Sequence, residues 1–278
     1  MASKLKPDGA RWSAAAAHLS KVDPVLGKVI ERVGACTISP RKDYFVTLCR
    51  AIYGQQVSTR VAEVLFGRLK AICPGGRLTP AAVIEILRDE ANIRAAGLSR
   101  QKAIYVRDLA EHFTDKRIPI RKLAKMGDEA VIESLVAVKG VGRWTAEMFL
   151  IFVLNRPDVL PVDDLGLQEG VRDVFNLPER PKPKQVIAMG ERWRPYRSIA
   201  TWYLWRRNTG KVADVKAGKS IEKGAAAAVQ VATKTPEAKV DRKEIAAKKT
   251  TRPSARASTR RSVRASTRRR SLPVLKKL

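Results

Sequence analysis

Three observations predict that this protein is all-α. Apolar residues recur at the three- and four-residue spacing of amphipathic helices through most of the first 210 residues. Proline, glycine and short polar stretches separate these segments. Few segments show the alternation of apolar and polar residues that is typical of half-buried strands. We therefore expect about ten helices joined by short connections.

The helical segments follow one another along the chain. Helical spacing is found within residues 25–33, 45–72, 81–89, 100–113, 129–138, 143–154, 165–175, 183–193 and 195–207. The stretch before them, residues 1–23, is polar and alanine-rich and is predicted to be an N-terminal arm. The helical domain is predicted to span residues 24–210.

The charge of the chain indicates its partner. There are 55 Lys and Arg residues against 27 Asp and Glu, a net charge of +28, which favours binding to a polyanion, nucleic acid first. A membrane is a poor alternative, because the sequence has no apolar run of about 18 residues and no signal-peptide pattern. Cys36, Cys49 and Cys73 are odd in number and widely spaced, so we expect buried thiols rather than disulfides or a zinc site.

The composition changes sharply after Gly210. Residues 211–278 contain no aromatic residue and carry 20 Lys and Arg against 5 Asp and Glu, a net charge of +15. The sequence Arg-Ala-Ser-Thr-Arg-Arg occurs in them twice, at 256–261 and 264–269. Such a segment cannot bury enough apolar surface to fold. We predict a disordered basic tail that binds DNA phosphates; a solvated tail without a specific role is the alternative.

A tight turn between two helices is predicted within residues 135–146. Gly140 and Gly142 bracket Val141, and glycine permits positive φ and leaves backbone N–H groups uncovered. The second helix begins near Arg143, so its positive end points outward and a phosphate can approach it closely. The pattern predicts a clamp for DNA phosphates, although glycine is also common in ordinary helix–helix turns.

Two carboxylates precede a later helix, in Leu160-Pro-Val-Asp-Asp-Leu-Gly166. An aspartate in this place is most simply an N-cap. On a basic, DNA-binding face, however, two acids would repel phosphates. We therefore expect Asp163 or Asp164 to do more than cap the helix.

The turn and the aspartates together resemble the helix-hairpin-helix (HhH-GPD) DNA glycosylase superfamily, and most closely the DNA-3-methyladenine glycosylase II type. Residues 51–58 (AIYGQQVS), 97–103 (GLSRQKA) and 191–198 (ERWRPYRS) match further motifs in the family's order, and the resemblance covers about residues 25–208. It implies two helical subdomains with the active site in the cleft between them. It also implies a monomer that binds double-stranded DNA containing damaged bases, in the cytoplasm at the nucleoid of a bacterium or in the nucleus of a eukaryote.

The resemblance assigns catalysis to Asp164 and leaves Asp163 to cap the helix or face solvent. A fixed carboxylate suits the cleavage of an N-glycosidic bond, because positive charge develops on the sugar. Alkylated bases such as 3-methyladenine and 7-methylguanine already carry positive charge, so they leave without protonation; hypoxanthine and ethenoadenine stay open as substrates. The product would be an abasic site.

Two alternatives remain at this stage. Family members that also cut the strand have a lysine where this chain has Trp144, so a bifunctional glycosylase and AP lyase of the oxidised-base or mismatch branch is disfavoured. We also expect no iron–sulfur cluster and no other cofactor, because no cysteine follows Cys73. A non-catalytic helix-hairpin-helix protein, in which the aspartates only cap, is the second alternative.

The remaining site residues are predicted by the same motif matches. The base pocket is predicted to consist of Trp144 and Trp205, which match pocket positions of the family, with Tyr53 and Trp202 as further aromatic residues for which core packing is an alternative. The DNA-binding residues are predicted to be Gly140, Val141, Gly142, Arg143, Thr145, Gln55, Gln56 and Ser58, with Gln56 preferred as the side chain that fills the gap left by the flipped base. A monovalent cation, Na⁺ or K⁺, is predicted on the backbone carbonyls of Val136, Val138 and Val141.

Overall fold

The computed structural model describes residues 11–209, and this part of the chain is helical without strands, which confirms the all-α prediction. It contains twelve α-helices: α1 Ser13–Val22, α2 Pro24–Val33, α3 Tyr44–Gly54, α4 Thr59–Ile72, α5 Pro80–Ile86, α6 Glu90–Ala95, α7 Arg100–Thr114, α8 Asp128–Val136, α9 Arg143–Phe152, α10 Leu165–Val174, α11 Pro183–Gly190 and α12 Arg197–Trp205. Three short 3₁₀ helices, η1 Pro74–Gly76, η2 Leu123–Lys125 and η3 Glu191–Trp193, complete it. The predicted tail, residues 211–278, lies outside the described residues.

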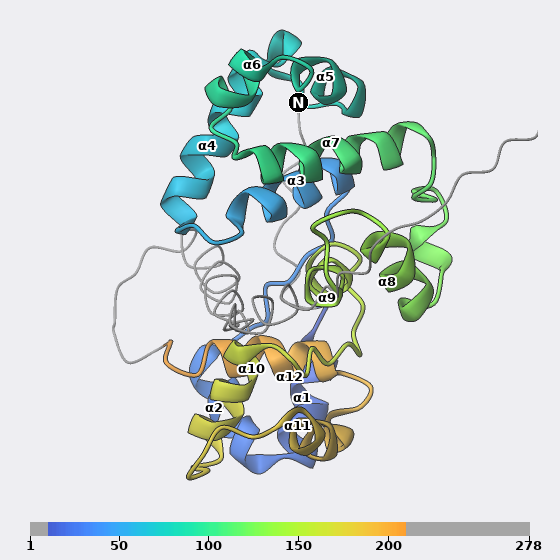
Figure 1. The fold of residues 1–278 in the computed structure, drawn as a ribbon. Helices are drawn as coiled ribbons and strands as arrows, with labels where there is room; N and C mark the ends of the chain where they lie inside the picture. Colours follow the sequence, from blue (N-terminus) through green and yellow to red (C-terminus); the bar gives the residue numbers. More distant parts are fainter. Residues whose placement is uncertain (1–10, 210–278) are drawn as a thin grey trace, which may run out of the picture. The chain divides into compact units, whose positions relative to one another are not determined.

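Helices α3 to α7 form one packed group (Figure 1). The helical spacing predicted over 45–72 is interrupted at residues 55–58, and the chain turns there from α3 into α4. Ser58 sets the start of α4, because its hydroxyl accepts a hydrogen bond from the N–H of Val61. Helix α7 packs against both α3 and α5, and α6 packs against α4.

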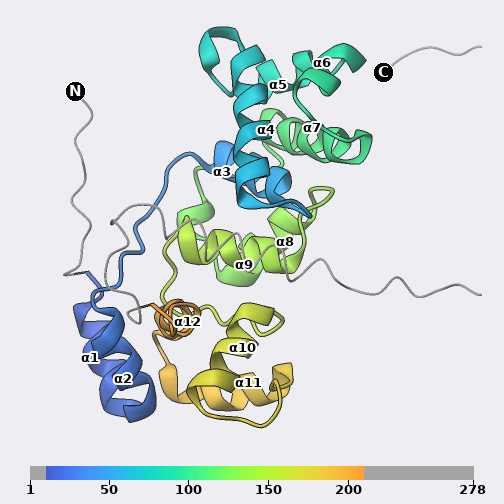
Figure 2. The same cartoon turned by 90° about the vertical axis from the view of Figure 1, so that its left-hand side faces the viewer.

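The second group combines the two ends of the described chain. Helices α1 and α2 pack against α12, and α10 packs against α2, α11 and α12 (Figure 2). The predicted N-terminal arm therefore needs correction: α1 is a packed helix, in which Ala15 and Leu19 are buried. Trp12, just before it, is also buried and donates its indole N–H to the carbonyl of Ile38 at 2.9 Å.

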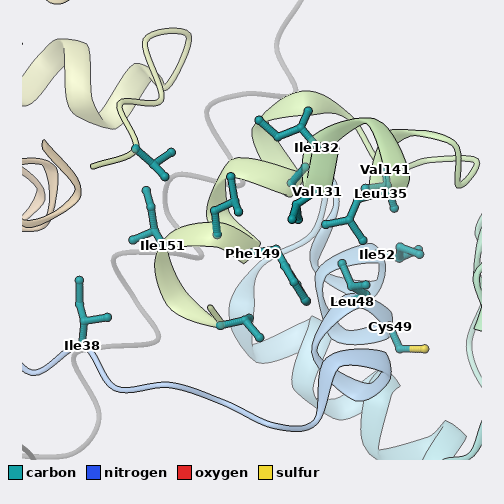
Figure 3. Packing of buried hydrophobic residues seen from close by; sticks show 14 of the residues in the cluster. Ile38, Leu48, Cys49, Ile52, Val131, Ile132, Leu135, Val141, Phe149 and Ile151 are labelled. Atoms are coloured by element: carbon teal, nitrogen blue, oxygen red, sulfur yellow. The ribbon is translucent and has the colours of Figure 1, made fainter. Parts of the chain in front are cut away.

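The α8–α9 hairpin lies between these groups (Figure 1). Its buried face packs on α3: Figure 3 shows Leu48 and Ile52 of α3 beside Leu135 and Val141 of the hairpin. All four side chains are less than a tenth exposed. Burying them fixes the hairpin relative to the start of the 55–58 turn, which is continuous with α3.

The three cysteines are buried free thiols, as predicted. Burial raises the pKa of Cys36 to about 12, so its thiol stays protonated at neutral pH. None of the helices between residues 11 and 209 is both long enough and apolar enough to cross a membrane.

Candidate active site

Asp164 is the N-cap of α10. Its Oδ1 accepts a hydrogen bond of 2.6 Å from the N–H of Leu167, one of the first-turn donors that the helix itself leaves unpaired. Asp164 therefore caps the helix, and Asp163 is exposed, which agrees with the second of the two roles given to it, facing solvent. Capping leaves the other carboxylate oxygen of Asp164 free for a second role.

Two indoles hold the Asp164 carboxylate. Trp205, the last residue of α12, donates to Oδ1 at 2.8 Å, and Trp144 of α9 donates to Oδ2 at 2.8 Å. The side chain is fully buried and makes no ion pair with any residue in the described part of the chain. Because no cation of the described residues offsets it, a negative charge on this carboxylate would act on nearby groups through a medium of low polarity.

Two glycines of α10 allow Trp205 to reach Asp164. Gly166 and Gly170 lie one turn apart and both face the end of α12. A Cβ atom on Gly170 would lie 2.9 Å from the carbonyl oxygen of Leu204, and a Cβ atom on Gly166 would lie 3.2 Å from Nε1 of Trp205. The absence of side chains at these positions thus permits the close approach of α10 and α12.

A cavity of about 200 Å³ lies beside Trp144. Trp144, Met148 and Phe152 line it from α9, at intervals of one helical turn, and α3 and α4 supply most of the opposite wall. Trp205, predicted as a pocket residue, does not line the cavity itself; its ring stacks on that of Phe152, which does, with ring centroids 5.6 Å apart and an interplanar angle of 20°. Met148 and Phe152 were not predicted as site residues, although their four-residue spacing from Trp144 was a signal that could have found them.

Tyr53 and Trp202 are not part of this pocket, and their predicted role needs correction. Tyr53 is 1% exposed and packs edge-on against Phe66 in the core between α3 and α4. Trp202 is 2% exposed, and the Arg206 guanidinium covers one face of its ring at 3.9 Å. Both aromatic rings stabilise the core instead, which was the alternative left open for them.

The hairpin turn has the predicted geometry at Gly140. Its φ of 79° is in the left-handed region that favours glycine, and a Cβ atom there would overlap the ring of Tyr105 on α7. The N-cap of α9 is Gly142, and no side chain caps the first turn of this helix. The uncapped first turn leaves backbone N–H groups available to an anion. Val141 and Thr145 are buried and support the turn from inside.

Arg143 does not project freely from the hairpin. Its guanidinium forms a bidentate pair with Glu129 of α8, at 2.9 and 2.6 Å, and its Nε donates to Glu147 one turn along α9 at 3.2 Å. Burial raises the pKa of Glu147 to about 7 against the lowering effect of Arg143, and the nearby charge of Asp163 raises it further. Arg143 thus joins the two helices of the hairpin, which sequence spacing did not predict.

The turn that contains Gln55 and Gln56 lies against the hairpin. The side-chain Nε2 of Gln55 donates to the carbonyl of Gly140 at 2.8 Å. Gln56 is exposed and has a φ of 58°, which residues other than glycine rarely adopt. Both residues line a second cavity of about 380 Å³, together with Gly140, Gly142 and Trp144. Ser58 is the N-cap of α4, so its hydroxyl is engaged with the backbone.

The hairpin offers backbone carbonyl oxygens as ligands for a cation. In the described part of the chain, no group of three or more His, Cys, Asp or Glu side chains is placed to hold a metal ion. The Val138 carbonyl accepts the N–H of Val141 at 3.0 Å and retains a second lone pair. Neutral carbonyls at Val136, Val138 and Val141 suit a monovalent ion, and this site stays a prediction.

Comparison with known proteins identifies the family. Residues 49–195 match the HhH-GPD superfamily of base excision DNA repair proteins. The chain belongs to this superfamily. DNA-3-methyladenine glycosylase 1 of Schizosaccharomyces pombe is 36% identical over 202 residues, which cover 71% of this chain and 87% of the relative. DNA-3-methyladenine glycosylase of Saccharomyces cerevisiae is 34% identical over 215 residues, covering 66% of this chain and 73% of the relative.

A solved structure supports the same grouping. The S. pombe 3-methyladenine DNA glycosylase in complex with abasic DNA aligns with a TM-score of 0.64 and 35% identity, over 73% of this chain and 100% of that chain. The described helices are therefore those of an HhH-GPD protein.

Proposed function

We propose that this HhH-GPD protein is a monofunctional DNA glycosylase of base excision repair, which hydrolyses the N-glycosidic bond of alkylated bases and leaves an abasic site. The observation that carries the proposal is the Asp164 carboxylate, which is buried without an ion-pair partner among the described residues and is held by the indoles of Trp205 and of Trp144, the latter lining an aromatic cavity. The relatives named as DNA-3-methyladenine glycosylases support it.

The charge of Asp164 serves the reaction at the sugar. When the bond to the base breaks, positive charge develops on the sugar, and a fixed anion beside it lowers the barrier. Oδ1 is occupied by the helix N–H and by Trp205, whereas Oδ2 is held by Trp144 alone. Because the carboxylate is fully covered, the sugar reaches Oδ2 only when the Trp144 indole gives up its hydrogen bond.

The aromatic cavity suits a cationic base. A methylated purine such as 3-methyladenine or 7-methylguanine carries positive charge and can stack on Trp144 with a favourable cation–π contribution of about 0.5–2 kcal/mol. Such a base leaves without protonation, so the site needs no general acid. Extruding the base from the duplex brings it into reach of Asp164.

The described residues that line the two cavities offer no amine free to act as the nucleophile of a lyase. Among the described residues that line the two cavities, Lys102 alone carries an amine, and its Nζ donates to two backbone carbonyls. An ammonium that is donating hydrogen bonds is not a nucleophile. The indole of Trp144 stands where strand-cutting members of the superfamily have lysine. Strand breaks are therefore expected only after chemical treatment of the abasic product.

Binding to duplex DNA is assigned to the hairpin and to the basic charge of the chain. The uncapped start of α9 offers N–H groups to one phosphate, and a monovalent cation on the nearby carbonyls would strengthen that contact. The protein would act as a monomer, at the nucleoid of a bacterial cell or in the nucleus of a eukaryotic one. The basic residues 211–278 would add phosphate contacts that do not depend on sequence.

One experiment tests this function. The protein is incubated with methylated duplex DNA, free 3-methyladenine and 7-methylguanine are measured, and strand breaks are counted with and without alkali. Release of free base with breaks only after alkali is the expected result. Breaks without alkali would instead show a lyase, and the absence of any base release would leave only a DNA-binding protein.

A further inference from the structure

Helix α7 contacts both of the turns that are predicted to bind DNA, the α8–α9 hairpin turn and residues 55–58. Lys102, Tyr105 and Asp108 are half-buried and follow one another at intervals of three residues, so they lie on one side of the helix. Tyr105 packs against Gly140 of the hairpin, and Oδ2 of Asp108 accepts the N–H of Lys139 at 2.8 Å. These two residues fix the hairpin to α7, whereas Lys102 contacts the turn after α3.

The ammonium of Lys102 binds the C-terminal end of α3. Its Nζ donates to the carbonyl of Tyr53 at 2.9 Å and to the carbonyl of Gln55 at 2.6 Å. The last carbonyls of a helix have no partner within the helix and carry partial negative charge, so a cation is favoured there. Burial lowers the pKa of Lys102 from its ordinary value. The lysine therefore gives up some hydration in order to make these contacts.

Gln55 connects the Lys102 contact to the hairpin. The backbone carbonyl of Gln55 accepts from Lys102, and its side-chain amide donates to the carbonyl of Gly140. Gln56 follows directly, exposed and with a positive φ that its surroundings must maintain. Lys102 thus holds the turn from one side while the hairpin holds it from the other. Figure 1 shows α3 and α7 lying side by side, which allows this contact.

We propose that Lys102 is a positioning residue that fixes the Gln55–Gln56 turn against the hairpin, so that Gln56 can occupy the gap left by an extruded base. This inference rests on the proposed glycosylase function. Both hydrogen bonds of Lys102 go to backbone carbonyls at the turn and neither goes to Asp164, so Lys102 acts on base extrusion and not on bond cleavage. Its removal should matter only where a paired base must be extruded.

The test compares two substrates within each variant. One is a short duplex with a single 7-methylguanine opposite cytosine; the other has the same lesion strand annealed to a complement that lacks this cytosine, so the lesion is bulged and already unpaired. Single-turnover rates of base release are measured for the wild type, Lys102→Met and Lys102→Arg. The ratio of the two rates does not depend on the folded fraction, because that fraction scales both rates equally.

For Lys102→Met we expect a rate on the paired lesion that is lower on the order of tenfold, and a rate on the bulged lesion within about twofold of the wild type. Lys102→Arg keeps a charged donor and should restore most of the rate. Lys184→Met, on an exposed position of α11, is the matched control and should change neither rate. Equal reductions on both substrates, or no reduction on either, would overturn the role of Lys102. A wild type that releases no base from either substrate would overturn the proposed function itself.

Discussion

The sharpest test of the site compares two buried aspartates that both cap a helix and both accept an indole N–H. Asp164 caps α10 and accepts the indoles of Trp144 and Trp205; Asp23 caps α2 through the N–H of Leu26 and accepts the indole of Trp193 at 2.8 Å. Both side chains are buried, at 0% and 2% exposed. Asp164→Asn and Asp23→Asn therefore make the same chemical change at two buried, indole-bound helix caps, which differ in that Asp164 accepts a second indole and Asp23 has the Arg192 guanidinium 3.9 Å away.

The expected loss of stability is similar in the two variants. An asparagine carbonyl can keep the bonds to Oδ1, but its NH₂ group then faces an indole N–H, Trp144 in one case and Trp193 in the other. Each variant loses one hydrogen bond to a charged acceptor and leaves two buried donors facing each other. The free energy of unfolding should fall by ~1.5–3 kcal/mol in each.

The expected effect on activity differs. Removing the charge of Asp164 removes a preorganised electrostatic group, so base release should slow by about 10²- to 10³-fold. Asp23→Asn should stay within about twofold of the wild type per folded molecule. Urea titrations measure the free energy of unfolding, and single-turnover release of 7-methylguanine, corrected for the folded fraction, measures the activity. Equal corrected losses in both variants would refute the catalytic assignment, because they would trace the effect to the fold.

Three further predictions concern the hairpin, the pH dependence of stability and the tail. Gly140→Ala should lower the free energy of unfolding by at least ~2 kcal/mol, because its φ of 79° and the Tyr105 ring leave no room for a methyl group. Gly142→Ala, with a φ of −92° and open space around it, should cost less than ~1 kcal/mol in urea unfolding but weaken duplex binding in a filter or anisotropy assay. Equal stability losses at the two glycines would contradict this interpretation of the turn. Glu147 has a pKa of about 7 in the folded protein against 4.5 ordinarily, so the folded state holds a proton that the unfolded state has released between these values. The free energy of unfolding should therefore fall as pH rises from 4.5 to about 7. Glu147→Gln should remove about 1–2 kcal/mol of that fall, as measured by urea unfolding at several pH values. If the variant has the same slope of unfolding free energy against pH as the wild type, other groups cause the dependence. Deleting residues 211–278 should reduce the slope of log affinity against log salt by about 0.9 for each DNA phosphate that these residues neutralise, and an unchanged slope would show that they neutralise none.

The sequence predicted those features that depend on local chemistry. Helical spacing located most of the helices. The pair Gly140 and Gly142 located the turn, and Gly140 has the positive φ that glycine permits. The break between α3 and α4 was less visible, because Gln55-Gln56-Val57-Ser58 interrupts the apolar spacing without a proline. Helix α1 was missed, because its alanine-rich sequence has few large apolar residues and its burial comes from contacts with α2, α12 and η3.

Contacts between distant segments could not be predicted from spacing. Tyr53 and Trp144 both lie on amphipathic helices, and an aromatic residue at helical spacing has the same pattern whether it faces the core or a cavity. From the sequence alone, Arg143 is predicted to bind DNA. The structure shows that it is paired with Glu129 on the preceding helix. The second group of helices combines residues from both ends of the described chain, and that pairing is set by the fold as a whole.

The comparison of Asp23 with Asp164 also shows what distinguishes a site from a structural contact. A capping carboxylate bound to an indole stabilises both helix starts, so this arrangement alone indicates no activity. Around Asp23 the Trp193 ring is fully buried and the half-exposed Arg192 guanidinium lies 3.9 Å away, so a nearby cation partly offsets the charge. Asp164 has no such cation among the described residues, and its second oxygen is held by a half-buried ring that borders two cavities. The chemistry therefore depends on the Trp144 contact, because it is the one bond to the carboxylate that can open toward a ligand.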